Sequence, residues 1–508
     1  MHGEPFSGYT LLLRTVLYGF TPAFLLWQHL RGRRALHIFQ LEGYRRGRFL
    51  DWCGRDRRRA LFLTSHPAKK PLVMTGRAWR LLATTLVLTG VVVLVPTGAV
   101  HVALGTPADL LSWLALTAGA FLGLPYLVVA ADVLLAPVQR TINARYLRAA
   151  RNKLQTYAPA VVGITGSFGK TSTKFAIAAL AGPTGSVLAT PASYNTPLGV
   201  ARAINEGLEA DHRVLVVEMG AYAVGDIGEL SEFARPSIGV LTSIGPAHLE
   251  RFGSLEAISQ AKYELIESLP SEGVAVMNCD DPQVRVLAEA TKRVRVIRYG
   301  TQRGGRPDIT ARDIKATARG TAFELLDEER NRIRVITRLL GAFAIGHILA
   351  AVGVARVLGR SLEELKGPIE DLEPTEHRLQ LIEGAGGVTV IDDAYNSNPE
   401  GAAAALDVLA AQPGNQKVVV TPGIIELGPL QFESNRNFGL QAAAVADTLV
   451  VVGETNRAAL LAGANAASDG AVIVIVDSLD AATEKLKSLL RPGDVVLFEN
   501  DLPDQYES

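Results

Sequence analysis

The sequence predicts an α/β protein with two parallel-sheet domains, the first of them with a phosphate-binding loop, preceded by transmembrane helices. Three observations predict this arrangement. Residues 81–100 and 110–130 are long stretches without a charged side chain. From residue 154 onward, β-rich runs alternate with helical stretches. Residues 161–180 place a hydrophobic run, a glycine-rich turn and Gly-Lys-Thr in the order of a phosphate-binding loop.

The N-terminal 153 residues are expected to form a membrane region. A helix needs about 20 apolar residues to cross about 30 Å of hydrocarbon, and residues 81–100 and 110–130 have this length. Residues 9–27 are a third candidate, which Arg14 and Pro22 interrupt. This segment either spans the membrane, with Arg14 reaching the interface, or lies along the membrane surface.

The distribution of charge predicts which side of the membrane each part faces. Residues 1–153 hold 20 Lys and Arg against 6 Asp and Glu, and 13 of these basic residues lie between 32 and 80. Residues 101–109 contain no Lys or Arg. The positive-inside rule therefore predicts a multi-pass membrane protein with the basic loop 31–80 and the later domains in the cytoplasm. The loop is either a topology signal or a site for anionic lipid or a phosphorylated lipid substrate.

The rest of the chain is expected to form two α/β domains, at residues 154–372 and 373–508. Near-continuous apolar runs between helices are typical of parallel sheets covered on both faces, and these runs begin near residues 212, 237, 273, 417, 447 and 471. Residues 301–340 alternate more like antiparallel strands. Only two cysteines are present, Cys53 and Cys279, which favours a reducing compartment over a disulfide framework.

The glycine-rich turn has the physical features of a nucleotide site. Gly166 and Gly169 let backbone amides turn inward, and a helix beginning near Lys170 would point its dipole at an anion. Lys170 can reach the phosphates, and the Thr171 hydroxyl can ligate Mg²⁺. The strict G-x-x-x-x-G-K-[ST] pattern nevertheless fails, because Ile164 stands at the position of its first glycine.

Three titratable side chains further along the chain are candidates for the same site. Glu218 ends a predicted strand, where a carboxylate can face the crevice of an open sheet and hold Mg²⁺ beside Thr171. His248 follows the next strand and, taken alone, is more typical of a loop histidine with satisfied hydrogen bonds. Lys262 lies on a predicted helix, where an ordinary lysine is a solvated charge.

Six motifs that occur in order between residues 158 and 500 resemble the Mur ligase family, ATP-dependent amide-bond ligases of peptidoglycan synthesis. They are ITGSFGKTSTK, VVEMGAYAVGDIGEL, SIGPAHLERFGSLEAISQAKYELIESLP, AVMNCDD, HRLQLI and VIDDAYNSNPEGAAAAL. The loop of that family has the form T-G-[ST]-x-G-K-[ST], which residues 165–171 match. The resemblance implies a P-loop parallel-sheet ATPase domain followed by a Rossmann-like C-terminal ligase domain.

The resemblance also implies a role for each matching residue. Lys170 and Thr171 would bind phosphates and a first Mg²⁺, with Glu218 on that metal. His248 and a carbamylated Lys262 would hold a second Mg²⁺. The other implied catalytic or ATP contacts are Thr165, Gly166, Ser167, Phe168, Gly169, Ser172, Asn278, His347, Asp393 at the ribose, and Arg378, which the C-terminal domain turns onto the γ-phosphate. The implied substrate contacts are Asn195, Thr196, Tyr395 and Asn396.

The implied reaction is an ATP-dependent carbon–nitrogen ligation. A substrate carboxylate attacks the γ-phosphate to give an acyl phosphate, and an amine then displaces phosphate. The implied partners are a UDP- or lipid-linked cell-wall peptide, an amino acid or dipeptide, and membrane lipid, with no nucleic acid.

Three departures from the family pattern leave alternatives open. Predicted membrane segments replace the UDP-binding domain of the soluble members. A lipid-linked or polymeric substrate, for instance of poly-γ-glutamate type, is therefore an alternative. Ala344 and His347 occupy the two Asn positions of G-x-H-N-x-x-N. VTPGIIELG at 420–428 replaces a G-D-M-x-E-L-G form, and ENDLPDQYES replaces a K-G-S type ending. A non-catalytic nucleotide-binding scaffold is the alternative from another class.

Overall fold

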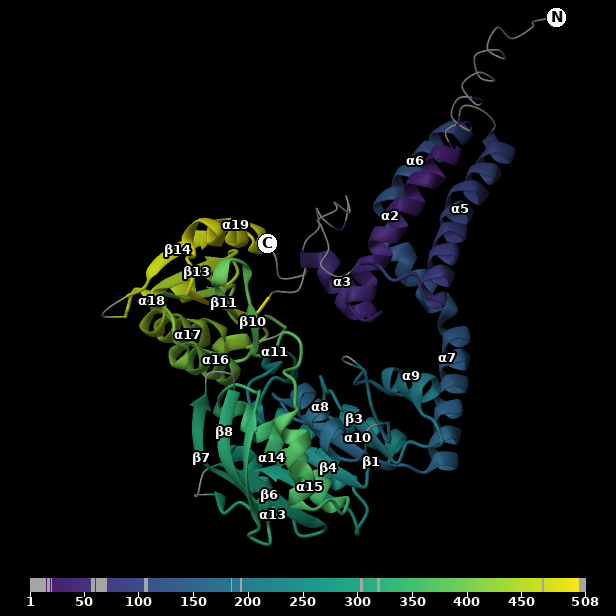
Figure 1. The fold of residues 1–508 in the computed structure, drawn as a ribbon. Coiled ribbons are helices and arrows are strands. Elements are labelled where there is room, and N and C mark those ends of the chain that lie inside the picture. The colour runs from purple at the N-terminus through teal and green to yellow at the C-terminus, as the bar shows by residue number, and fades with distance from the viewer. Residues whose placement is uncertain are drawn as a thin grey trace, which may run out of the picture. The chain divides into compact units, whose positions relative to one another are not determined.

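The computed structural model describes residues 15, 19, 21–55, 60, 71–104, 108–183, 185–191, 194–301, 305–317, 320–395, 397–467 and 470–501. They form two compact units, Met1–Arg145 and Tyr146–Ser508, and helix α7 runs from the first into the second (Figure 1).

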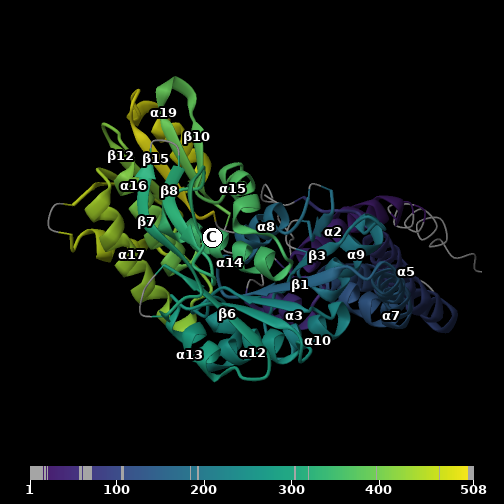
Figure 2. The same ribbon diagram turned by 60° about the horizontal axis from the view of Figure 1, so that its bottom comes forward.

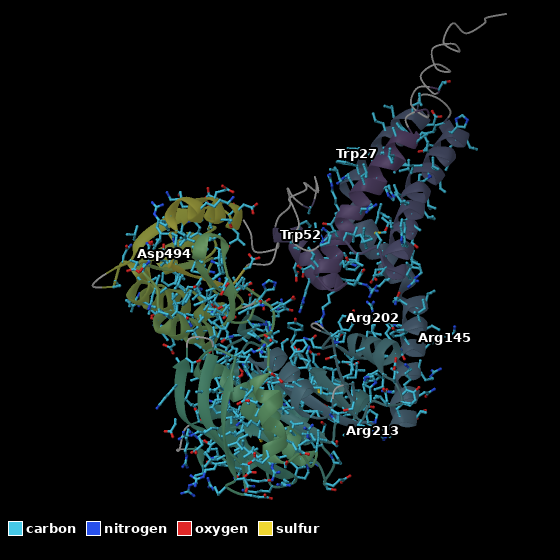
Figure 3. All side chains as sticks on the ribbon, in the orientation of Figure 1. Trp27, Trp52, Arg145, Arg202, Arg213 and Asp494 are labelled. Carbon is cyan, nitrogen blue, oxygen red and sulfur yellow. The ribbon has the colours of Figure 1, made fainter. Side chains whose placement is uncertain are left out.

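The first unit is a set of helices packed around a small apolar core. Trp27 stacks on Phe121 with ring centroids 4.4 Å apart, and Gly32 allows close approach, since a Cβ there would lie 2.9 Å from Leu82 Cδ1 (Figure 3 labels Trp27). Asp132 receives hydrogen bonds from Arg46 and Arg77 at 2.7 and 3.0 Å. The helices are α2 (Thr21–Leu41), α3 (Arg46–Arg55), α5 (Gly76–Leu104), α6 (Ala108–Leu122) and the start of α7 (Leu124–Tyr157).

These helices differ from the predicted membrane region in two ways. The stretch 81–100 lies inside α5 as expected, but 110–130 is not one helix, because α6 ends at Leu122 and α7 begins at Leu124. Pro125 contributes to the break, since it lies in the first turn of α7 and has no N–H to continue the hydrogen bonds of α6. The basic loop 31–80 contains the end of α2, all of α3 and the start of α5. Most of the segment 9–27 lies outside the described residues. By length and composition, α5 and α7 could each cross a membrane.

A nine-stranded sheet, in the order β2-β3-β1-β4-β5-β6-β7-β8-β9, forms the first part of the second unit. Its strands pair in parallel from β2 to β7, and β8 and β9 pair antiparallel, as the alternation at 301–340 predicts. The strands are β1 (Ala160–Thr165), β2 (Val187–Ala189), β3 (Val214–Glu218), β4 (Ile238–Leu241), β5 (Val274–Asn278), β6 (Arg295–Gly300), β7 (Ile309–Thr317), β8 (Gly320–Leu326) and β9 (Arg332–Thr337).

Helices cover both faces of this sheet (Figure 2). One face packs against α8 (Lys170–Leu180), α14 (Gly341–Val357) and α15 (Leu362–Glu370). The other packs against α9 (Pro197–Gly207), α10 (Asp226–Ala234), α12 (Leu255–Glu267), α13 (Pro282–Ala290) and the end of α7, and α11 (Leu249–Phe252) lies at its edge. Because both faces are buried, the central strands are continuous apolar runs. Their carboxyl ends lie side by side, with Ile164 opposite Glu218 and Thr165 opposite Leu241.

A second, six-stranded sheet follows, in the order β10-β11-β15-β12-β13-β14, and only β10 is antiparallel. The strands are β10 (Gln380–Glu383), β11 (Thr389–Asp393), β12 (Lys417–Thr421), β13 (Thr448–Val452), β14 (Val472–Val476) and β15 (Val495–Glu499). Helices α16 (Pro399–Ala411), α17 (Gln431–Val445) and α18 (Arg457–Ala464) bury one face, and α19 (Leu479–Leu489) packs on the other. The short helices η2 (Ala385–Gly387) and η3 (Gly428–Leu430) lie in loops. The chain is thus a mixed α/β protein with two largely parallel sheets.

Candidate active site

The glycine-rich turn connects β1 to α8, and α8 begins at Lys170 as expected. Gly169 has a φ of 77°, and a Cβ there would lie 2.6 Å from His347 Cε1. Gly166 has a φ of 151°, and its Cβ would lie 2.0 Å from Thr242 Oγ1. Backbone geometry and space therefore both require glycine at these two positions.

The loop after β4 holds the glycine-rich turn in shape. The backbone N–H groups of Ser167 and Phe168 donate to the backbone and side-chain oxygens of Ser243 at 2.9 and 2.8 Å. Ser167 Oγ donates to Gly245 O at 3.0 Å, and Thr165 Oγ1 donates to Met219 O at 3.0 Å. Thr165, Ser167 and Phe168 thus set the loop conformation, and Ser172 lies in the first turn of α8.

The Lys170 side chain curls back over the loop. Its Nζ donates to Gly166 O at 2.7 Å and to Ser167 O at 3.2 Å. Desolvation lowers the pKa of Lys170; the carboxylate of Glu218 counters this shift, and the charge of Arg378 adds to it. The phosphate-loop lysine and the C-terminal arginine, far apart in sequence, thus act on each other electrostatically.

Thr171 and Glu218 meet as predicted, and Lys174 joins them. Thr171 Oγ1 donates to both carboxylate oxygens of Glu218, at 3.2 and 3.1 Å. Lys174 Nζ lies 3.1 Å from Glu218 Oε2, with the lysine fully buried. The sequence offered a signal for Lys174 that was missed: it lies four residues after Lys170 and so on the same face of α8.

We expect Lys174→Ala to destabilise the protein by about 3–5 kcal/mol, because it removes the ion-pair partner of the buried Glu218 carboxylate. Thermal unfolding should show a clear fall in melting temperature. The exposed lysine in Lys292→Ala is the matched control and should leave it unchanged. A Lys174→Ala protein that melts with the wild type would contradict this role.

His248 and Lys262 lie near the same loop. Lys262 is 3% exposed, and its pKa is lowered to about 7, first by burial and then by the charge of Lys170. Asp226 and Glu264 raise it less, and both carboxylates accept backbone N–H bonds elsewhere. His248 also has a lowered pKa, mainly because of burial, with Lys170 and Lys262 among the lesser causes. A buried lysine with this pKa is partly a neutral amine, the form that reacts with CO₂ to give a carbamate.

Arg378 and Asp393 meet a third residue, Glu499. Asp393 ends β11 and pairs in register with Glu499, which ends β15. Burial raises the pKa of Asp393 to about 6 while Arg378 opposes the shift, and burial followed by the charge of Asp393 holds the pKa of Glu499 well above its usual range. Ser397 Oγ donates to Glu499 Oε1 at 2.5 Å. Both carboxyl groups therefore favour the protonated form more than solvent-exposed carboxyl groups do.

We expect Glu499→Gln to stabilise the protein at pH 8 by on the order of 2 kcal/mol, and by much less near pH 4. The raised pKa values mean that the folded state binds protons more tightly than the unfolded state. Wild-type stability is therefore lost as pH rises from about 4 through 6, and the amide removes one of the two charges. Melting temperatures across this range test it, with the exposed Glu484→Gln as control. Parallel curves for wild type and Glu499→Gln would count against the raised pKa values of this carboxyl pair.

The structure places the remaining predicted ATP contacts as follows. His347 Nδ1 lies 3.1 Å from Thr173 Oγ1 beside Gly169, and burial, with the charge of Arg378, lowers its pKa to about 4, so the ring is neutral. Its other ring nitrogen is not engaged by this contact. Asn278 donates to Thr242 O at 2.9 Å and accepts from Asp280 N at 3.0 Å, so its amide shapes the turn after β5.

The described substrate contacts lie on two loops, one before α9 and one after β11. Asn195 packs against Gly220, whose Cβ would lie 2.7 Å from Asn195 Nδ2, next to the Glu218 strand end. Thr196 caps α9 by accepting from Gly199 N at 3.3 Å. Tyr395 is half exposed and lies under the Arg378 guanidinium, 4.7 Å from its centre. Asn396 lies outside the described residues.

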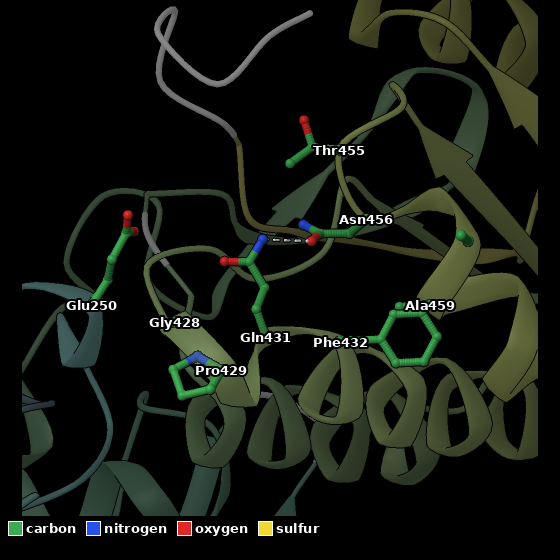
Figure 4. Close-up of a pocket in the computed structure, with 9 residues that line it drawn as sticks. Glu250, Gly428, Pro429, Gln431, Phe432, Thr455, Asn456 and Ala459 are labelled. Carbon is green, nitrogen blue, oxygen red and sulfur yellow. Dashed lines mark hydrogen bonds between the residues drawn. The ribbon is translucent and has the colours of Figure 1, made fainter. Parts of the chain in front are cut away.

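A cavity of about 480 Å³ opens beside the loop at 420–428 (Figure 4). Gln431 Nε2 donates to Asn456 Oδ1 at 3.0 Å along its wall, where α17 and α18 begin. The lining residues are Glu250, Gly428, Pro429, Gln431, Phe432, Thr455, Asn456, Ala458 and Ala459. The wall thus combines amide groups with apolar surface from Phe432.

The described residues would bind Mg²⁺ through a hydroxyl, a carboxylate, an imidazole and a carbamate, and not through a cluster of carboxylates. Among the described residues, no cluster of three His, Cys, Asp or Glu side chains could hold a metal ion. One ion could use the hydroxyl of Thr171 with the carboxylate of Glu218, which are in contact, since oxygen donors suit Mg²⁺. A second could use His248 with Lys262 once that amine has become an anionic carbamate.

Comparison with known proteins defines the class. Residues 164–355 match the Mur ligase middle domain, and residues 377–499 match the Mur ligase, glutamate ligase domain. A ligase from Mycobacterium bovis is 35% identical over 362 residues, which cover 67% of this chain and 70% of the relative. The chain therefore belongs to the Mur ligase family, the ATP-dependent amide-bond ligases.

Several relatives within this family share one name. The M. bovis protein is a UDP-N-acetylmuramoyl-tripeptide–D-alanyl-D-alanine ligase, and so is one from Escherichia coli, 32% identical over 299 residues, which cover 59% of this chain and 65% of the relative. MurF from Acinetobacter baumannii is similar in structure, with a TM-score of 0.64, 27% identity, and 72% and 78% of the two chains covered. MurF from Thermotoga maritima in complex with ADP is also similar, with a TM-score of 0.63 and 28% identity, and the match covers 71% of this chain and 80% of that one.

Proposed function

We propose that this chain is a membrane-anchored ligase that uses ATP to join a cell-wall peptide carboxylate to an amino acid or dipeptide. The D-alanyl-D-alanine-adding reaction of its relatives is the closest known activity. One observation carries the proposal: three cations gather here, since, after burial, the charge of Arg378 lowers the pKa of Lys170 and the charge of Lys170 lowers the pKa of Lys262. Cations gathered in a desolvated site favour a polyanion, and the triphosphate of ATP is one.

The proposed reaction has two steps. An oxygen of the substrate carboxylate attacks the γ-phosphorus, the bond to the β–γ bridging oxygen breaks, and ADP leaves an acyl phosphate behind. The amine nitrogen then attacks the acyl carbon, the C–N bond forms, phosphate leaves, and the amine loses a proton. Lys170 and Arg378 neutralise charge on the phosphoryl group and hold it in line. Mg²⁺ ions on Thr171–Glu218 and on His248–carbamylated Lys262 would add to this neutralisation.

The amino component is proposed to bind in the cavity beside residues 420–428. This stretch departs from the family form, and the cavity offers amide groups of Gln431 and Asn456 beside the aromatic ring of Phe432. Its composition supports an amine that carries both a polar group and an apolar side chain.

The distribution of side chains on α5 supports the membrane anchoring. Polar side chains are buried and large apolar ones are exposed, the opposite of a helix in a soluble protein. Its threonines at 85, 89 and 97 are buried, and each donates to the carbonyl four residues earlier, at 2.7, 2.9 and 2.6 Å. The large apolar side chains Val87, Val91 and Val95 are exposed instead. Hydrocarbon around the helix explains both features, because hydroxyls there must be satisfied internally. Extraction of membranes with alkaline carbonate should leave the full chain in the membrane fraction. Release of the chain into the soluble fraction would contradict the anchor.

A lipid-linked acceptor is the second candidate, and the first unit favours it. Helices and basic residues occupy the place of the UDP-gripping domain of soluble members, and a lipid-linked carboxylate would lie at the membrane surface.

Phosphate release from ATP by the detergent-purified chain tests the function. One set of reactions contains UDP-linked muramoyl tripeptide with D-alanyl-D-alanine, and the other contains lipid-linked precursors with a panel of amines. We expect release that depends on both acyl and amino substrates. If none of the acceptors supports turnover while ATP still binds, the scaffold alternative replaces the ligase.

A further inference from the structure

Glu426 and His248 lie 178 residues apart in sequence, and their side chains are in direct contact. His248 Nδ1 hydrogen bonds to Glu426 Oε2, and Arg251 Nη2 donates to Glu426 Oε1 at 2.5 Å. Glu426 belongs to the loop after β12 in the C-terminal domain, whereas His248 immediately precedes α11 in the ATP-binding domain. The contact therefore joins the two domains at a predicted metal ligand.

Both residues adopt a backbone conformation that side chains rarely take. The φ angles are 63° at Glu426 and 59° at His248, in the left-handed region. A non-glycine residue stays there only where its surroundings hold it. Two such residues facing each other indicate that the contact is built into both loops.

Buried amides hold the Glu426 loop. Asn435 accepts from Ile424 N at 2.7 Å and donates to Ile424 O at 2.8 Å, while Asn456 donates to Pro422 O at 3.0 Å. Gly423 has a φ of 81°, and a Cβ there would lie 2.3 Å from Asn435 Oδ1. Glycine is thus required where the family form G-D-M-x-E-L-G has Asp, and the Glu of that form is retained as Glu426.

The other side of the imidazole is also fixed. The Tyr222 ring lies edge-on to His248 at 5.1 Å between centroids, and the Arg251 guanidinium lies 4.6 Å from the centre of the Tyr222 ring. Because Glu426 occupies Nδ1, only Nε2 remains to bind another group.

We infer that Glu426 is a positioning residue that fixes the His248 imidazole for metal binding through Nε2, so that docking of the C-terminal domain completes the second metal site. Histidine ligands in metal sites commonly donate their other ring N–H to a carboxylate, which sets the tautomer and the ring orientation. Here that carboxylate comes from the other domain. The inference rests on the proposed function in one respect, namely that His248 is a metal ligand.

A cross-link can report the docking without any catalysis. An ideal Cβ at Gly428 lies 3.7 Å from Glu250 Cβ, within the range of disulfides. The variant Glu250→Cys/Gly428→Cys should therefore form a disulfide under mild oxidation, and the native cysteines Cys53 and Cys279 are buried. The same cysteine pair is then combined with Glu426→Ala and with Glu426→Gln. Its combination with Glu433→Ala, which removes an exposed carboxylate, is the control. Since Gly428 has a φ of 54°, Gly428→Cys alone is first checked by its melting temperature.

Binding of Mn²⁺ alone, followed by electron paramagnetic resonance in bicarbonate buffer, reports the metal site. We expect Glu426→Ala to slow the cross-link and to weaken one Mn²⁺ site by about 10–100-fold, with Glu426→Gln between it and the wild type. Glu433→Ala should change neither. If Gly428→Cys does not fold, the Mn²⁺ titration stands alone as the test.

Three outcomes would overturn the inference. Unchanged Mn²⁺ binding in Glu426→Ala, with binding weakened in His248→Ala, rejects the positioning role while leaving the proposed metal site intact. Unchanged binding in His248→Ala rejects the metal assignment itself. A slower cross-link with unchanged Mn²⁺ binding would reduce Glu426 to a docking contact.

Discussion

Lys170→Ala should lower ATP-dependent phosphate release by on the order of 10³-fold or more while leaving the fold intact. The ammonium of Lys170 lies over the carbonyls of Gly166 and Ser167, at the N-terminus of α8. These carbonyls belong to the loop that would hold the phosphates, and an alanine would remove a cation that could neutralise the γ-phosphoryl charge. The desolvated setting that lowers the Lys170 pKa also strengthens its attraction to an anion.

Matched variants separate this effect from general damage. Lys292→Ala removes an exposed lysine of the same domain and should retain full activity. The wild type, Lys170→Ala and Lys292→Ala should have similar melting temperatures, because both hydrogen bonds of Lys170 are local, to carbonyls of the same loop. Activity of Lys170→Ala within tenfold of the wild type would show that this loop does not carry the reaction.

Lys262→Ala is expected to reduce the rate by about 10²-fold or more, with partial rescue by acetate or formate. The side chain is buried, and its pKa of about 7 gives it a neutral fraction that can add to CO₂, forming an N–C bond and releasing a proton. The carbamate would be an oxygen ligand, and a small carboxylate can occupy the space that alanine leaves. Lys262→Arg, which cannot be carbamylated, should be inactive and not rescued.

A direct observation of the carbamate completes this test. Incubation with ¹³C-bicarbonate should give a carbamate carbonyl resonance in ¹³C NMR of the wild type that Lys262→Arg lacks. A fully active enzyme without that resonance would reject the carbamate and leave Lys262 as an ordinary buried amine.

The local sequence pattern was enough to predict how the residues near the phosphate-binding loop are placed. The order of strand, glycine turn and helix at 161–180 predicted the α8 start at Lys170, and the strand end predicted Glu218 beside Thr171. These inferences succeeded because neighbouring parallel strands bring their carboxyl ends to one edge. Roles beyond position, such as metal ligation by His248, remain predictions.

The partners that sequence reasoning missed come from non-local pairings. Glu499 meets Asp393 only because β15 inserts beside β11, and the sequence gives no sign of that strand order. Glu426 meets His248 through a contact between domains, and the changed residues around it drew attention to the amine substrate instead. Pro125 was a signal that the sequence analysis did not use, and the predicted span at 110–130 is divided at Gly123.

Oxygen-isotope transfer tests the central claim most directly, that the chain makes amide bonds through an acyl phosphate. The acyl substrate, UDP-linked or lipid-linked, carries ¹⁸O in its reacting carboxylate, and the phosphate released with the amide is examined by mass spectrometry. The account predicts one ¹⁸O in the released phosphate for each amide formed, and neither product in Lys170→Ala. Amide formation with unlabelled phosphate, or phosphate release without any amide, would contradict it.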